Sequence, residues 1–220
     1  MDCTFVSIVI CKVVEYNVNN IDKIAPTLDV TGNPTAWTNK DVTLTATVSD
    51  GTVEYFNGSK WIAGDKYTVS ANGTYKFRVT DVAGNVTEQS IVVDKIDKVA
   101  PTLEITGNAT TWTNRDVTLT ATASDGTVEY FDGTEWIEGD SLTAVKNGTY
   151  QFRVTDQAGN VTEKSVVVNK IDKIAPSLEI TGNATAWTNK DVTLSAIVSD
   201  GTVEYFNGTE WIEGNSFSAV

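Results

Sequence analysis

The chain has 220 residues, 40% of them hydrophobic, and its 29 acidic and 16 basic side chains give a formal net charge of −13. This hydrophobic content is sufficient for packed cores, and the length suits two or three small domains. The excess of acid argues against a nucleic-acid partner, because phosphate binding needs clustered lysine and arginine. Histidine is absent from the sequence, which excludes serine–histidine and cysteine–histidine catalysis.

The first twenty residues differ from the rest of the chain. Residues 5–14 are rich in β-branched side chains, so we predict a strand there. This run is too short to span a bilayer, and Lys12 interrupts it, which fits neither a membrane helix nor a signal peptide. We interpret residues 1–20 as a degenerate leading strand or a fragment of a preceding repeat. The two cysteines, Cys3 and Cys11, both lie in this segment, so no disulfide framework supports the remainder.

The remainder of the chain is a repeat with a period of 75 residues. The hexapeptide Ile-Asp-Lys-(Ile/Val)-Ala-Pro occurs at residues 21–26, 96–101 and 171–176. About 54 of the 75 positions are identical between residues 21–95 and 96–170, a period near the size at which a chain closes its own small core. We predict two complete domains there and a partial third at residues 171–220, cut from a longer array. We expect this third domain to be the least stable.

Within the second repeat, apolar and polar residues alternate and no helical period is sustained. Residues 117–123 alternate valine, leucine and alanine with threonine, as expected of a strand with one buried face. Glycine, asparagine and aspartate turn signals separate the strands. These signals predict strands at residues 102–105, 117–123, 128–131, 135–137, 141–145, 149–155 and 161–168. Seven short strands in one repeat predict an all-β sandwich.

Two runs of the second repeat are distinctive: WTNRDVTLT at Trp112–Thr120 and NGTYQFRVTDQAGN at Asn147–Asn160. Together with the linker DKVAP at residues 97–101, they resemble the bacterial immunoglobulin-like repeats of large surface and secreted proteins of Gram-positive bacteria. The resemblance covers residues 21–220. It implies tandem Ig-like β-sandwich domains that space or present other domains, as in adhesins, S-layer-associated proteins and accessory regions of secreted glycosidases. This family shares a scaffold more than one activity.

A tyrosine at the start of the sixth strand is a further point of similarity. Tyr75 and Tyr150 each follow Asn-Gly-Thr, where immunoglobulin-like sandwiches carry a tyrosine whose hydroxyl bonds back to the preceding turn. Asp125-Gly126, between the second and third strands, instead has the sequence of a two-residue hairpin. Those strands belong to opposite sheets in an immunoglobulin fold, so a variant sandwich topology stays open.

Acidic and amide side chains are expected to gather at one pole of each complete domain. In an Ig-like sandwich the linker meets the loops after the second and sixth strands there, which brings together Asp22, Asp50, Asp81 and Asn85 in repeat one, and Asp97, Asp125, Asp156 and Asn160 in repeat two. Such oxygen ligands suit Ca²⁺, which would stiffen the junction between domains. The alternative, which we favour, is that these residues only form turns and solvated linkers. No other cofactor is expected.

Each repeat carries two tryptophans, which in repeat two are Trp112 and Trp136. Exposed on one face, they would stack on sugar rings. The alternative is packing in the core or over a sheet edge, which we favour because large aromatic side chains dominate burial in small domains. Of the two, Trp136 is the one we expect to be partly exposed, because it lies on a predicted edge hairpin.

The sequence does not predict an enzyme. Glycoside hydrolysis needs two carboxylates that face each other across a cleft, and a small sandwich has little room for one. We expect a non-catalytic spacer or stalk of a bacterial extracellular, cell-wall surface protein that extends a distal domain in cell adhesion. It would be a monomer whose partners are its neighbouring repeats, without nucleic-acid binding or membrane insertion. Two alternatives stay open: a module that binds a host or cell-wall glycan or protein receptor, and a decoration domain of a phage virion.

Overall fold

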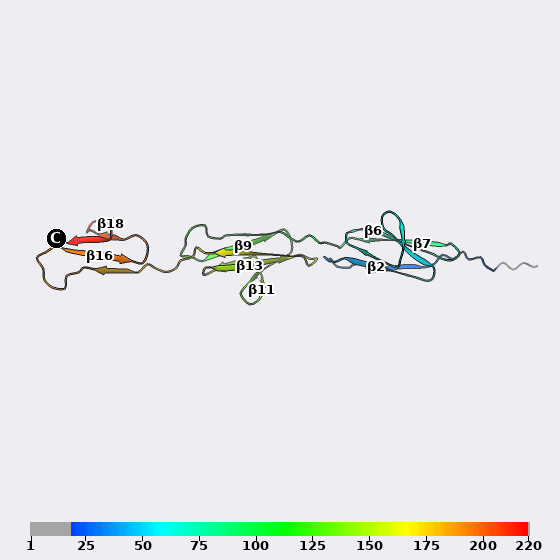
Figure 1. Cartoon of the computed structure of the whole chain (residues 1–220), viewed down its shortest axis with the longest axis horizontal. Helices are drawn as coiled ribbons and strands as arrows, with labels where there is room; N and C mark the ends of the chain where they lie inside the picture. Colours follow the sequence, from blue (N-terminus) through cyan, green and yellow to red (C-terminus); the bar gives the residue numbers. More distant parts are fainter. Residues whose placement is uncertain (1–18, 220) are drawn as a thin grey trace, which may run out of the picture. The chain divides into compact units, whose positions relative to one another are not determined.

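The computed structural model describes residues 19–219, and all regular structure in this range is β-strand. The antiparallel strands form three repeating units of small sheets (Figure 1). No helix in the described range has the length and apolar character needed to cross a membrane. The strand predicted at residues 5–14 lies outside the described residues. The all-β class and its repetition are therefore confirmed for the described part of the chain.

Repeat one contains seven strands that form a three-stranded and a four-stranded sheet. The strands are β1 (Leu28–Thr31), β2 (Val42–Val48), β3 (Thr52–Phe56), β4 (Trp61–Ala63), β5 (Lys66–Val69), β6 (Gly73–Thr80) and β7 (Val86–Val93). The strand orders are β1-β2-β5 and β4-β3-β6-β7. Neighbouring strands whose pairing is resolved are all antiparallel.

Repeat two has the same arrangement. Its strands are β8 (Leu103–Thr106), β9 (Val117–Ala123), β10 (Thr127–Phe131), β11 (Trp136–Glu138), β12 (Ser141–Ala144), β13 (Gly148–Thr155) and β14 (Val161–Val168). They form sheets of order β12-β9-β8 and β11-β10-β13-β14. All seven strands predicted from the sequence are present, with ends that differ by at most one residue, because alternation and turn signals agree at each of them.

Period-two alternation places one face of each strand in the core. In β2, Val42, Leu44 and Ala46 are buried while the threonines between them face outward. Leu44 of one sheet and Phe77 of the other are both 0% exposed and belong to a single core cluster. Leu119 and Phe152 are likewise fully buried in repeat two. Residues of the two sheets thus close one core in repeat one.

The described chain divides into two compact units. The first ends at Thr102 and also takes in Ser124–Thr127 and Val154–Thr162, and the second contains the remaining residues. The core of repeat one includes the first residue of the next sequence repeat. Ile96 is 6% exposed and belongs to the core cluster of repeat one. Ile171 is buried to the same degree, with 7% of its surface exposed.

The Asp125-Gly126 pair has the sequence of a two-residue hairpin but does not form one. It joins β9 to β10, which lie in different sheets. Gly126 has φ of 84°, and a Cβ there would lie 2.5 Å from the Thr155 carbonyl oxygen. A residue with a side chain would collide with that backbone, so the glycine permits a tight passage from one sheet to the other. Asp-Gly signals a turn in the sequence, but it does not say which sheet the next strand joins.

The tyrosine prediction is confirmed in both complete repeats. The Tyr75 hydroxyl donates to the Ala71 carbonyl at 2.7 Å, and the Tyr150 hydroxyl donates to the Lys146 carbonyl at 2.8 Å. Each bond ties the start of the sixth strand to the turn that precedes it.

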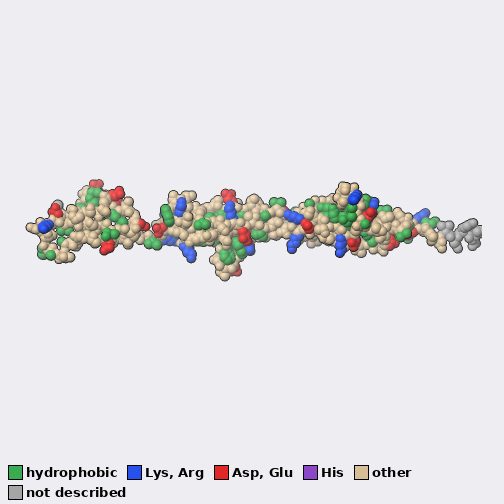
Figure 2. Space-filling model, viewed as in Figure 1, with side chains coloured by type: hydrophobic (Ala, Val, Ile, Leu, Met, Phe, Trp, Pro, Cys, Tyr) green, Lys and Arg blue, Asp and Glu red, His purple; other side chains and the backbone are tan. Residues whose placement is uncertain are grey.

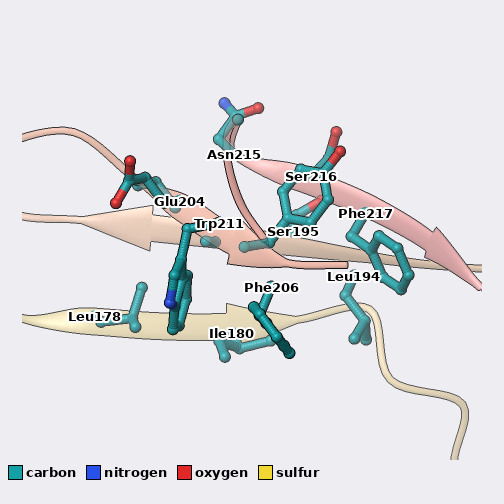
Figure 3. A pocket seen from close by; sticks show the side chains of 14 residues that line it. Leu178, Ile180, Leu194, Ser195, Glu204, Phe206, Trp211, Asn215, Ser216 and Phe217 are labelled. Carbon is teal, nitrogen blue, oxygen red and sulfur yellow. The ribbon is translucent and has the colours of Figure 1, made fainter. Parts of the chain in front are cut away.

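Repeat three has five strands in the described residues: β15 (Leu178–Thr181), β16 (Val192–Val198), β17 (Glu204–Phe206), β18 (Trp211–Glu213) and β19 (Ser216–Ala219). They form a sheet of order β15-β16-β19 and the pair β17-β18. An open apolar hollow of about 450 Å³ is lined by residues of both, among them Ile180 and Trp211 (Figure 3). Leu178 is 61% exposed, whereas its counterpart Leu103 is 8% exposed.

Candidate functional site

The segment around Asp97 follows the last strand of repeat one and precedes the first strand of repeat two. It is fixed by backbone pairing to the loop before β2: Thr38 N–H donates to the Lys95 carbonyl, and Asp97 N–H donates to the Thr38 carbonyl, both at 2.9 Å. The Lys98 ammonium forms an ion pair with Asp41. All these residues lie within the first compact unit. The connecting segment is therefore held in place by the fold rather than left as a free tether.

Asn72 adds a side-chain clamp to the same segment. Its Nδ2 donates to the Ile96 carbonyl at 2.9 Å, and its Oδ1 accepts from the Ile96 N–H at 2.8 Å. Asn147 makes the same two bonds to Ile171, each at 2.9 Å. One amide thus satisfies both backbone groups of a buried isoleucine. The sequence identifies these asparagines only as turn residues, because their partner lies 24 positions away.

The predicted polar pole of repeat two is assembled. Asp156 accepts from the Asn160 N–H at 2.8 Å and from its Nδ2 at 2.7 Å. Asn160 Nδ2 also donates to the Asp97 carbonyl at 3.0 Å. Gly126 packs against the backbone of Asp156, which brings the neighbouring Asp125 to the same pole. The four residues predicted from sequence therefore come from three segments that meet.

Repeat one repeats this network with the same spacing. Asp81 accepts from the N–H and Nδ2 of Asn85, both at 2.8 Å, and Asn85 Nδ2 reaches the Asp22 carbonyl at 3.3 Å. Asp22, Asp50 and Asp81 line one hollow of about 390 Å³. Within residues 19–219, however, no three acidic or cysteine side chains are close enough to share a metal ion. The calcium prediction, which also counts amide and carbonyl oxygens, stays a prediction.

Hydrogen bonding keeps these loop carboxylates ionised. The Asn85 side chain, together with backbone N–H groups, outweighs partial desolvation and lowers the pKa of Asp81 below its ordinary value. Desolvation is the largest influence on Asp156 and opposes ionisation, but hydrogen bonds from Asn160 and neighbouring N–H groups together outweigh it, so the pKa of Asp156 is also lowered. Both carboxylates thus serve as acceptors that close their own loops.

The tryptophans occupy two different environments. Trp136 is half-buried: the Arg153 guanidinium lies over its ring, with Cζ 4.5 Å from the centroid, and the centroid of the Phe131 ring is 5.4 Å away. Arg153 is held in turn by Glu129, with an Nε to Oε2 distance of 2.6 Å. Repeat one repeats the cluster, with Arg78 over Trp61 at 4.4 Å. Sequence reasoning missed it because three strands supply its members.

The expectation that Trp136 would be the more exposed tryptophan was wrong. Trp112 is 70% exposed, and its counterparts Trp37 and Trp187 are 41% and 106% exposed. These residues lie in the loop between the first two strands of each repeat, outside the sheets, whereas the arginine and phenylalanine cover Trp136. The prediction that the tryptophans pack against other residues is therefore confirmed for Trp61 and Trp136, and it is wrong for Trp37 and Trp112.

Charged side chains do not gather into a patch of one sign on the face shown in Figure 2, where acidic groups are scattered among basic and neutral ones.

Comparison of the chain with family models and with curated proteins finds no match.

Proposed function

We propose that the chain is a non-catalytic spacer: a tandem array of immunoglobulin-like β-sandwich domains that extends a distal domain of a bacterial extracellular surface protein in cell adhesion. The sheet orders support the domain type, since the second and third strands of each complete repeat lie in opposite sheets. The hydroxyl bond of Tyr150 to the preceding turn is a second feature of such sandwiches. Resemblance of the motifs is the support for a bacterial surface location.

The observation that carries the spacer proposal is the anchoring of the connecting segments. Ile96 is buried in repeat one, Asn72 binds both of its backbone groups, and Asp97 is bonded to Thr38 as well as to Asn160. A spacer must pass force from one domain to the next without a slack tether. Fixed connections between domains that each close a core are suited to this task.

Small-angle X-ray scattering of the full chain tests the proposal. A single compact body of this length has a radius of gyration of about 17 Å, and an unfolded chain has about 50 Å. We expect a value clearly between the two, together with a folded circular-dichroism spectrum. A value near that of one compact body would contradict the spacer proposal.

Glycan binding is a second candidate, favoured by the exposed tryptophan at the same position of each repeat. The indole of Trp112 is free for stacking on a sugar ring, whereas Arg153 already covers a face of Trp136. The test is binding of cell-wall polysaccharide to the intact chain and to a Trp37→Ala/Trp112→Ala/Trp187→Ala variant. Val82→Ala is the control, because Val82 is likewise an exposed hydrophobic side chain. Equal binding by all three proteins, or none, would remove this candidate.

A further inference from the structure

Four Asn-Gly pairs in the chain fall into two structural classes. Asn57-Gly58 and Asn207-Gly208 form the tips of the hairpins β3–β4 and β17–β18, and Asn72-Gly73 and Asn147-Gly148 precede β6 and β13. Asn-Gly is the dipeptide most prone to spontaneous loss of the side-chain amide, because glycine offers little hindrance to attack by its backbone nitrogen. The surroundings of the four amides differ.

At the hairpin tips the amide oxygen is bound and the amide nitrogen is free. Asn57 Oδ1 accepts from the Ser59 N–H at 3.1 Å, the Ser59 hydroxyl at 3.0 Å and the Lys60 N–H at 3.0 Å. Asn207 Oδ1 accepts from the N–H groups of Thr209 and Glu210 at 2.8 and 3.0 Å. In the described residues, neither Nδ2 donates a hydrogen bond. Donors fixed on the oxygen polarise the carbonyl and would stabilise negative charge there during attack on Cγ, as in an oxyanion hole.

The other two amides are held at both ends. Asn72 and Asn147 each use Oδ1 and Nδ2 in bonds to one buried isoleucine backbone. In addition, Gly73 is paired with Val93 in the sheet, so its nitrogen is part of a strand rather than a loop. Reaction there would require loss of the clamp and of the strand start.

The second repeat shows that the hairpin accepts the product. Asp132 stands where the other repeats have Asn57 and Asn207, and its Oδ1 accepts from the Thr134 and Glu135 N–H groups at 2.7 and 2.9 Å. The bond across the turn is also kept, at 3.1 Å in all three repeats. The N–H groups of Glu135 and Thr134 lower the pKa of Asp132. A carboxylate is therefore well accommodated at this position.

We propose that Asn57 and Asn207 are sites of spontaneous deamidation, promoted by the turn donors at Oδ1, and that the fold protects Asn72 and Asn147. The backbone nitrogen of Gly58 bonds to Cγ of Asn57, the bond from Cγ to Nδ2 breaks, and the nitrogen's proton leaves with the amide as ammonia. Water then opens the cyclic imide to aspartate or isoaspartate. No oxidant or enzyme is needed, and each event adds one negative charge to a hairpin tip.

The experiment is incubation of the full folded chain in mildly alkaline buffer at 37 °C, followed by peptide mapping with mass spectrometry. We expect Asn57 and Asn207 to deamidate at least about tenfold faster than Asn72 and Asn147, a barrier difference of roughly 1.4 kcal/mol. The same incubation in concentrated urea is the control for sequence effects. All four pairs should then react at similar rates, because each is followed by glycine.

Ser59→Ala separates donor activation from simple exposure. It removes the hydroxyl donor at Oδ1 and keeps both N–H donors, so deamidation of Asn57 should slow while that of Asn207 is unchanged. Equal rates at all four sites in the folded chain would overturn the proposal. Faster deamidation of Asn72 and Asn147 than of Asn57 and Asn207 in the folded chain would also overturn it. A Ser59→Ala variant in which Asn57 deamidates at the original rate would overturn it as well.

Discussion

The guanidinium of Arg153 lies over the indole ring of Trp136, on the side of the four-stranded sheet that faces away from the core. Cation–π contacts and partly exposed ion pairs each contribute modestly to stability, and here one arginine makes both, because it also binds Glu129. The same cluster is present in repeat one. The cluster is therefore a shared feature of the two complete repeats.

Arg153→Ala should lower the melting temperature of repeat two and increase the fluorescence change of Trp136 on addition of a quencher, because the ring loses its cover. The effect on stability should be much smaller than that of Phe152→Ala, which removes a fully buried side chain and should cost about 3–5 kcal/mol. Thermal unfolding and quenching measure the two effects. Gln151→Ala, at an exposed position of the same strand, is the control, and an equal change in both variants would contradict the assigned role.

Asn147→Ala should destabilise repeat two by about 1–3 kcal/mol, since the N–H and carbonyl of buried Ile171 both lose their partner. Asn147→Asp keeps the acceptor for the N–H but loses the donor for the carbonyl, so it should be destabilising as well. Hydrogen exchange at the Ile171 amide should rise most in the alanine variant. Unchanged exchange there in both variants would show that the clamp contributes nothing.

Acid should destabilise the complete repeats through the polar pole. The pKa values of Asp81 and Asp156 are lowered in the folded state. The two carboxylates therefore stabilise the fold fully above the unfolded aspartate pKa of about 3.9, and this stabilisation is lost as the pH falls through the folded pKa values. Melting curves from neutral pH downward should show this loss below about pH 4. An Asp81→Asn/Asp156→Asn variant should start less stable at neutral pH and show a flatter acid limb. An unchanged acid limb would contradict this prediction.

Calcium binding at the poles is tested by calorimetric titration of the chain. Binding should release or absorb heat and raise the melting temperature of repeats one and two. An Asp97→Asn/Asp156→Asn variant should bind less. Neither heat nor a melting shift with the unmodified chain would remove the calcium prediction.

Repeat three should exchange its amide hydrogens faster than the other two. Its β15 is exposed along its length, and Ile180 is 63% exposed, so fewer apolar contacts oppose local opening. Hydrogen exchange with mass spectrometry should show low protection at Leu178–Thr181 and high protection at Leu103–Thr106. Equal protection of these matched strands would refute the prediction.

The strands were predictable because each one satisfies two local rules at once. Residues 117–123 alternate in polarity and are bounded by turn residues, so their ends and their buried face both follow from the sequence. The polar pole was also predictable, because its loops carry short-range aspartate and asparagine signals and the resemblance places them together. Local rules do not say which sheet a strand joins after a turn, so Asp125-Gly126 left the topology of the sandwich open.

Side-chain environment was harder to predict than strand position. The exposure of Trp112 and Trp136 was reversed because it depends on Arg153, which comes from a strand that is distant in sequence. The clamp of Asn147 on Ile171 was missed for the same reason. An arginine and a glutamate facing outward on paired strands next to a tryptophan are the signal that would have indicated the cluster.

The burial of Ile96 in the core that precedes it has a consequence for how such a gene can change in length. The sequence repeat begins at Ile96, whereas the folded domain of repeat one still includes that residue. Every boundary nevertheless carries the same Ile-Asp-Lys residues. Unequal recombination that inserts or deletes one whole period therefore returns an isoleucine to each core and an aspartate to each following pole, wherever the crossover falls. The number of repeats can therefore change by whole periods without creating a new kind of junction between domains.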